Sequence, residues 1–176
     1  MIICLSGKQG SGKSELARYL QEKGFELLVL SEIARDMVPS ESLNINSAVK
    51  RMMNQQGENI LARLAMERIR NDGGDITLVV KSKIDFGYLK DKLQDMPTLY
   101  IKAPSDLRRD RVLSRSVKRN RPRTDADFTR KEANEAELEI EFIPKNANCV
   151  IENTGTMEEL CEAAGRFLEE FKPNQI

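Results

Sequence analysis

The chain has 176 residues and a formal net charge of +0, from 28 basic and 28 acidic side chains. This length suits one domain with a buried core, and the neutral balance argues against a protein that binds polyanions over its whole surface. No apolar run approaches the roughly 20 residues of a membrane span. The N-terminal residues show no signal-peptide pattern. We therefore expect a cytoplasmic protein that does not contact membranes.

Two residue types exclude further classes of site. The chain contains no histidine, so histidine-based nucleophilic sites and histidine metal ligands are excluded. The three cysteines, Cys4, Cys149 and Cys161, have no C-x-x-C spacing. We therefore predict small buried apolar side chains at these positions, and neither a disulfide framework nor a zinc site.

Short apolar runs alternate with helical patterns along the chain. Strands are predicted at 2–6, 26–30, 76–80, 98–101 and 149–151. Helices are predicted at 12–23, 31–39, 47–71, 85–93, 104–116, 126–142 and 157–171. Ser31 is expected to cap the second helix, Gly57 to bend the third, and residues 118–127 to be non-helical. This order predicts an α/β fold with a five-stranded parallel sheet, helices on both faces, and a ligand at the carboxyl ends of the strands.

A glycine-rich motif follows the first predicted strand. Eight residues match G-x-x-x-x-G-K-[ST] without a mismatch: Gly7, Lys8, Gln9, Gly10, Ser11, Gly12, Lys13 and Ser14. Glycines let the backbone N–H groups point at phosphate oxygens, and the helix that starts at Gly12 adds its positive end. Lys13 supplies a charge for the β- and γ-phosphates, and Ser14 offers a hydroxyl to Mg²⁺. The motif predicts a phosphate-binding loop for ATP and Mg²⁺.

A second feature is a cluster of basic residues in the latter half of the chain. Ten lie within 24 positions: Arg108, Arg109, Arg111, Arg115, Lys118, Arg119, Arg121, Arg123, Arg130 and Lys131. One interpretation is a lid that clamps phosphates. A second is a surface network paired with the glutamates that follow, and a third is a nucleic-acid patch, which lacks interleaved aromatics.

With these residues in view, the chain resembles the adenylate-kinase and dephospho-CoA-kinase group of P-loop kinases. It looks closest to an archaeal family described only as related to adenylate kinase. The resemblance covers nearly the full length. Besides the loop, it rests on residues 31–35, 57–64, 103–104, 125–135 and 150–155, and on Arg111 and Arg115.

The resemblance implies a three-layer P-loop nucleoside triphosphate hydrolase fold in a single domain, 1–176. Its core would comprise 1–30, 73–115 and 145–176. A helical substrate-binding insertion would occupy about 31–72, and a lid with its following helix about 116–144.

The resemblance also implies roles for side chains. Nucleotide contacts would come from the loop at Gly7, Gln9, Gly10, Ser11, Gly12, Lys13 and Ser14, from Arg111 stacked on adenine, and from Asn153 and Gly155 beside the base. Lys13, Arg115 and Arg119 would act on the phosphates. Glu32, Arg35 and Arg63 would face the acceptor, with Glu32 as a catalytic residue and Ser14 as the metal ligand.

The sequence departs from the family pattern in two places. After the second strand the family has an aspartate, whereas Ser31 and Glu32 stand here, and Glu32 can do the same work with one more methylene. After the third strand the family has Asp-Gly, whereas this chain has Lys81 and Ser82. A cation therefore replaces a carboxylate that would help to order Mg²⁺.

Two hypotheses follow. The first is an ATP- and Mg²⁺-dependent kinase acting on a nucleotide or another small phosphorylated acceptor, of nucleoside monophosphate kinase or dephospho-CoA kinase type. The second is a nucleotide-binding switch or degenerate kinase that binds ATP without efficient transfer, motivated by Lys81. A GTPase lacks support because no Asn-Lys-x-Asp motif is present. The sequence leaves the oligomeric state open.

Overall fold

The computed structural model describes residues 1–38, 45–118, 120 and 122–171. At its centre is one parallel sheet of five strands in the order β2-β3-β1-β4-β5. The strands are β1 (Ile2–Gly7), β2 (Glu26–Val29), β3 (Ile76–Val79), β4 (Thr98–Lys102) and β5 (Cys149–Glu152). The predicted α/β fold with a five-stranded parallel sheet is confirmed.

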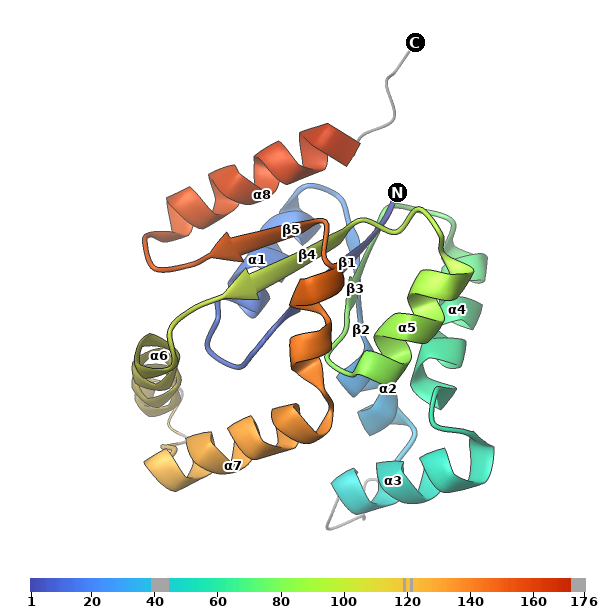
Figure 1. Ribbon diagram of the computed structural model, residues 1–176, viewed down its shortest axis with the longest axis horizontal. Helices are drawn as coiled ribbons and strands as arrows, with labels where there is room; N and C mark the ends of the chain where they lie inside the picture. Colours follow the sequence, from blue (N-terminus) through green and yellow to red (C-terminus); the bar gives the residue numbers. More distant parts are fainter. Residues whose placement is uncertain (39–44, 119, 121, 172–176) are drawn as a thin grey trace.

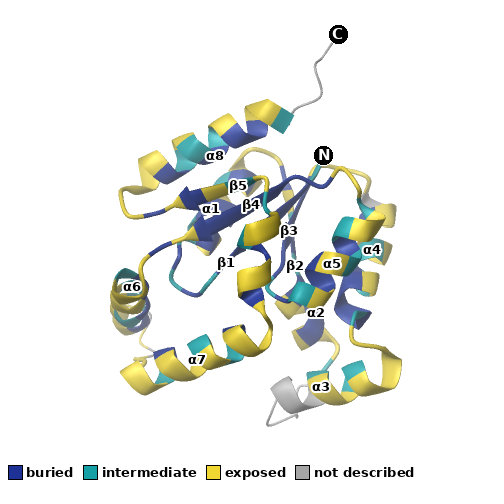
Figure 2. Cartoon of the chain, viewed as in Figure 1, coloured by how far each residue is buried: buried dark blue, intermediate teal, exposed yellow. Residues whose placement is uncertain are grey.

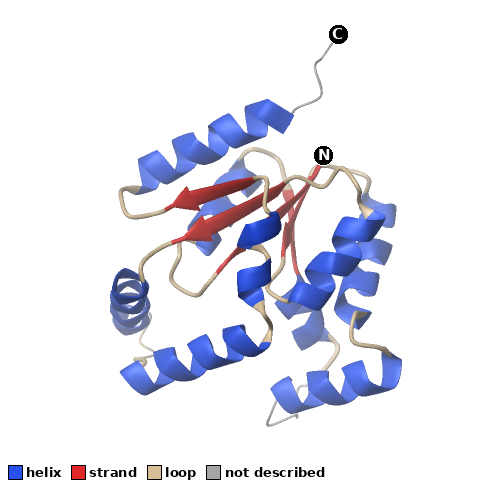
Figure 3. Cartoon of the chain, viewed as in Figure 1, coloured by secondary structure: helices blue, strands red, loops and turns tan. Residues whose placement is uncertain are grey.

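Helices surround this sheet (Figure 3). They are α1 (Lys13–Glu22), α2 (Leu30–Asp36), α3 (Ile45–Gln56), α4 (Ile60–Asp72), α5 (Lys83–Lys92), α6 (Ser105–Lys118), α7 (Asp125–Glu137) and α8 (Met157–Phe171), with short 3-10 turns η1 (Ile140–Phe142) and η2 (Pro144–Asn146). Figure 1 shows α6 and α7 beyond the tips of the β4 and β5 arrows. None of the helices in the described ranges is both long and apolar enough to cross a membrane.

The sheet separates two hydrophobic cores. Ile3 and Leu5 of β1 pack in one core with side chains from α1 and α8, and Cys4 between them packs in the other with α2, α4 and α5. Successive side chains of a strand point to opposite faces, which explains why one apolar run serves both layers. Figure 2 shows the inner strands β1, β3 and β4 mostly buried, and α7 largely exposed by comparison.

Two predicted helices are shorter in the structure. The predicted helix 47–71 is two helices, α3 and α4, because Gly57 has a left-handed φ of +102° and ends the first rather than bending it. The predicted helix 126–142 ends at Glu137, and Glu139 has a left-handed φ of +49° before the 3-10 turns.

Three smaller expectations also changed. Val29, not Ser31, is the residue before α2, and no side chain caps that helix. Helix α6 continues to Lys118, so the non-helical stretch is shorter than predicted. Of the three free cysteines only Cys4 is fully buried, and burial raises the pKa of its thiol to about 12. Cys149 and Cys161 are partly exposed.

Candidate functional site

The phosphate-binding loop lies at the carboxyl end of β1 and leads directly into α1. Its glycines are required by close contacts as well as by backbone shape. Gly10 has a φ of +75°, and a Cβ there would collide with the backbone carbonyl of Arg108. Gly12 has a φ of +105°, and a Cβ there would collide with the side-chain amide of Asn153. The loop therefore holds a conformation that side chains would disrupt.

Groups in this loop fit a bound phosphate chain. The first backbone N–H groups of α1 have no acceptor within the helix, as at any helix N-terminus. The buried hydroxyl of Ser11 has no hydrogen-bond partner within the described part of the chain. Lys13 is buried and has no ion-pair partner among those same residues. A buried ammonium group without a counter-ion is the feature that an anionic ligand would satisfy.

The surroundings of Lys13 lower the pKa of its ammonium group far below the ordinary lysine value. Its pKa is lowered to about 7, first by burial and next by the positive charge of Lys81. Glu135 and Glu15 act in the opposite direction, and Arg115 lowers the pKa slightly further. These groups therefore lie near the ammonium group of Lys13, at the mouth of the loop.

Gln9 connects the loop to α6 and α7. Its side-chain amide donates to the backbone carbonyl of Phe128 at 2.8 Å, and its backbone carbonyl accepts from Arg108 at 3.2 Å. Arg108 also makes a bidentate pair with Glu132, at 2.7 and 2.8 Å. The guanidinium is 5% exposed, so this is a buried polar network. The sequence did not predict that Arg108 would hold the phosphate loop through its hydrogen bond to the Gln9 carbonyl.

Members of the basic cluster pair with carboxylates, as the surface-network interpretation expects, but two of the partners are aspartates and the Arg108–Glu132 pair is buried. Arg108 pairs with Glu132, Arg109 with Asp125 and Arg130 with Asp127. Arg115 pairs with Glu15, which follows Ser14 on α1, at 3.1 Å. The predicted catalytic residue Arg119, like Arg121, lies outside the described residues.

The expected base-binding residues lie on the β5 side of the loop. The side-chain amide of Asn153 donates to the carbonyl of Ser11 at 2.7 Å. The backbone carbonyl of Asn153 accepts from Arg111 at 3.1 Å. Gly155 follows two residues later on the exposed connection to α8. Arg111 and Asn153 are thus brought together next to the loop, and stacking of Arg111 on adenine stays a prediction.

On the opposite side, Lys81 follows β3 and pairs with Glu135, one of the glutamates that the surface-network interpretation included. The ammonium group of Lys81 donates to Glu135 at 2.8 Å, and the other oxygen of Glu135 accepts from the backbone N–H of Gln9 at 3.0 Å. Glu135 is fully buried. Its position on the loop-facing side of α7, with Phe128 and Glu132, follows helical spacing, but which face meets the loop depends on tertiary packing.

The residues predicted to face the acceptor are exposed. Glu32 and Arg35 lie three residues apart on α2, and therefore share a face of that helix. Arg63 begins the second turn of α4 and donates to the backbone carbonyl of Gln56, at the end of α3, at 3.2 Å. The pKa of Lys131 is lowered by desolvation and by nearby positive charges, which are those of Lys81, Arg123 and Arg35. Arg35 therefore belongs to the same positively charged region as Lys81.

The residues present also suit Mg²⁺ held through phosphates. Ser14 is exposed at the start of α1. No group of three or more cysteine or carboxylate side chains able to hold a metal ion occurs within the described ranges. Mg²⁺ in nucleotide sites needs few protein ligands, because phosphate oxygens and water complete its octahedral shell. Ser14 is the residue that would hold the ion.

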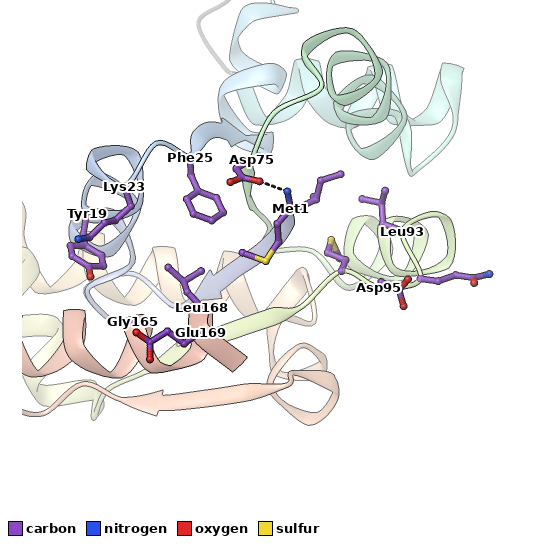
Figure 4. A pocket seen from close by; sticks show the side chains of 13 residues that line it. Met1, Tyr19, Lys23, Phe25, Asp75, Leu93, Asp95, Gly165, Leu168 and Glu169 are labelled. Atoms are coloured by element: carbon purple, nitrogen blue, oxygen red, sulfur yellow. Dashed lines mark hydrogen bonds and ion pairs between the residues drawn. The ribbon is translucent and has the colours of Figure 1, made fainter. Parts of the chain in front are cut away.

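A cavity of about 1100 Å³ lies elsewhere, at the amino ends of the strands. Figure 4 shows it between the start of β1, α1 and α8, with Met1, Phe25 and Leu168 in its wall. No residue of the phosphate loop lines it. Because ligands of open α/β sheets bind at the carboxyl ends of strands, we assign the nucleotide site to the loop and not to this cavity.

A phosphate loop between the first strand and helix of a sheet ordered 2-3-1-4-5 defines a P-loop nucleotide-binding protein. The chain belongs to the AAA_18 family, described as an AAA domain, whose model matches residues 3–139.

Three known proteins are similar to the chain in sequence or in fold. A UPF0200 protein of the archaeon Saccharolobus islandicus is 28% identical over 166 residues, which cover 90% of this chain and 87% of that protein. The crystal structure of TT1252 from Thermus thermophilus superposes on this chain with a TM-score of 0.65. The superposition covers 98% of each chain, and the two sequences are 24% identical. Shikimate kinase from Acinetobacter baumannii, in complex with shikimate, superposes with a TM-score of 0.59 and is 17% identical. The superposition covers 97% of this chain and 94% of the kinase chain. The resemblance to P-loop kinases and to an archaeal family is confirmed.

Proposed function

We propose that this protein is a kinase that transfers the γ-phosphoryl group of ATP, with Mg²⁺, to a small acceptor that already carries a phosphate. The observation that carries the proposal is Lys13, a buried lysine without an ion-pair partner in the part of the chain that the structure describes, at the mouth of a phosphate loop. Nucleotide phosphates are the ligand class that such a loop binds.

On the donor side, the loop amides and Lys13 would bind and orient the phosphate chain. Ser14 would hold Mg²⁺, which supplies neutralisation of the phosphate charge. Arg115, held near Lys13 by Glu15, would stabilise charge on the transferring group, and Arg119 would assist it. Arg111, Asn153 and Gly155 would border the base. Catalysis of this kind consists of positioning and charge stabilisation.

On the acceptor side, several cations support a phosphorylated acceptor over a neutral one. The positive charges of Lys81, Arg123 and Arg35 lower the pKa of Lys131, and the carboxylate of Glu135 acts in the opposite direction. A phosphate on the acceptor would satisfy such a region, whereas a neutral alcohol would leave it unbalanced. Arg35 and Arg63 would bind the acceptor, and Glu32 would orient its nucleophilic oxygen.

The test is ATP consumption with Mg²⁺ against a panel of nucleoside monophosphates, dephospho-CoA and their unphosphorylated parents. We expect turnover with at least one phosphorylated acceptor and none with its parent. Lys13→Ala serves as the blank. Turnover by that variant equal to the native rate would refute the proposal.

A second candidate is a nucleotide-binding switch, and the contact that favours it is the Lys81–Glu135 ion pair where related kinases have Asp-Gly. It predicts tight ATP binding and no transfer to any acceptor of the panel. Fast turnover by the native protein would eliminate it.

A further inference from the structure

Lys81 emerges from the sheet directly beside the phosphate loop. Strand β3 pairs in parallel with β1, with Val79 opposite Leu5. One residue on, the hydroxyl of Ser6 donates to the carbonyl of Val80 at 2.6 Å. The register therefore brings Lys81 next to Gly7, where the loop begins. This position is set by strand pairing and is independent of any ligand.

The ammonium group of Lys81 is linked to the loop through Glu135 of α7. It binds one oxygen of Glu135, whose other oxygen accepts from the backbone N–H of Gln9. The side chain of Glu135 is 1% exposed and that of Lys81 is 25% exposed. The carboxylate is thus enclosed by protein, whereas the lysine is partly exposed to solvent.

Lys81 has donor capacity to spare. An ammonium group carries three N–H donors, and Lys81 uses one of them within the described residues. Its flexible stem allows the group to turn from one anion to another without a change of backbone. A triphosphate, which carries about four negative charges when fully ionised, would compete directly with Glu135 for this cation.

We propose that Lys81 is a second phosphate-binding lysine of this site, and that Glu135 holds its ammonium group in the nucleotide-free protein and yields it to the terminal phosphate. The inference deepens the proposed nucleotide function and rests on it. The sheet order explains why the terminal phosphate is the target. Asn153 follows β5 on one side of β1, whereas Lys81 follows β3 on the other side, near Lys131 and Arg35.

The experiment measures binding of ADP and of a non-hydrolysable ATP analogue, each with Mg²⁺, by isothermal titration calorimetry. We expect Lys81→Met to weaken analogue binding roughly tenfold and ADP binding less than about twofold, as for loss of one charge-assisted hydrogen bond. Glu135→Gln keeps an acceptor for the Gln9 N–H but releases Lys81. It should tighten analogue binding about threefold or more, again by the scale of one weakened charged contact.

A double variant and a matched ion pair complete the design. In Lys81→Met/Glu135→Gln, which leaves no buried unpaired charge, the gain caused by Glu135→Gln should vanish. Lys83→Met and Glu139→Gln remove a pair of the same length, 2.8 Å, between the first residue of α5 and the turn after α7, on the exposed surface. These controls should leave both affinities unchanged.

Three results would overturn the inference. Equal weakening of ADP and analogue by Lys81→Met would make Lys81 a structural residue. Persistence of the Glu135→Gln gain in the double variant would make that gain a general charge effect. A native protein that binds neither nucleotide would refute this inference and the proposed function together. Native binding with the expected variant pattern but no transfer to any acceptor would support the inference and refute only the kinase.

Discussion

The donor and acceptor sides of the site are built differently. On the donor side, Gln9, Arg108 and Asn153 are buried, and each hydrogen-bonds to or within the phosphate loop. On the proposed acceptor side, Glu32 and Arg35 are exposed, and Arg63 is exposed and donates a hydrogen bond to Gln56 at the end of α3. The residues of the proposed nucleotide site are therefore held in place by protein contacts, whereas the residues proposed to bind the acceptor are held by few.

The largest effect should come from breaking the donor side at its centre. Lys13→Ala removes the buried charge that faces the phosphates, and we expect phosphoryl transfer to fall by roughly 100- to 1000-fold, the scale for one preorganised electrostatic group. Steady-state kinetics with saturating ATP would measure it. Lys23→Ala, at the C-terminal end of the same helix, is the control and should retain the native rate.

The buried network of Arg108, Gln9 and Glu132 can be disrupted without changing a residue proposed to bind phosphate. Arg108→Met leaves Glu132 without its buried partner and should lower the free energy of unfolding by about 3 kcal/mol. Arg109→Met is the control, since its partner Asp125 is exposed and such pairs contribute about 0.5 kcal/mol. Urea unfolding of both variants gives the comparison. Equal loss in the two would show that the buried network does not stabilise the fold.

The acceptor side should respond to a different variable. Arg35→Ala removes one cation that would bind the acceptor phosphate, and we expect the KM for the acceptor to rise about tenfold. The KM for ATP should stay within about twofold, because the donor side is organised independently. Arg70→Ala, an exposed arginine at the end of α4, is the control. If the KM for ATP rose as much as the KM for the acceptor, the proposed independence of the donor and acceptor sides would be wrong.

The smallest expected effect is a pH dependence of nucleotide binding that arises from Lys13. Its pKa of about 7 in the nucleotide-free protein lies below the ordinary lysine value, so part of the population is neutral above neutral pH. Bound phosphates favour the charged form and raise this pKa, so nucleotide binding takes up a proton. Nucleotide affinity should therefore fall as pH rises above about 7.

Calorimetry at pH 8 in buffers of different ionisation enthalpy measures that uptake. We expect proton uptake for the native protein and none for Lys13→Arg, because arginine stays charged. An absence of uptake in the native protein would mean that Lys13 is already charged before the nucleotide arrives.

The sequence predicted the parts of the molecule that depend on local pattern. Alternating apolar runs indicated the parallel sheet, and the motif from Gly7 to Ser14 indicated the loop between β1 and α1. The break at Gly57 was visible as a bend only, since a glycine permits a left-handed φ but does not require it.

The contacts that organise the site were not predictable in this way. Glu135 lies 126 positions from Gln9 along the chain, and Arg108 lies 99 positions from it. Which glutamate of a charged helix becomes buried depends on how that helix docks on the loop, and spacing alone does not determine docking.

The central claim is transfer of a phosphoryl group from ATP to a phosphorylated acceptor through a preorganised loop. The most direct test follows the label from γ-³²P-ATP into nucleoside monophosphates and dephospho-CoA, for the native protein and for Lys13→Ala. We expect labelled product with at least one of these acceptors, formed roughly 100- to 1000-fold more slowly by the variant. Tight ATP binding by the native protein with no labelled product from any of them would contradict it.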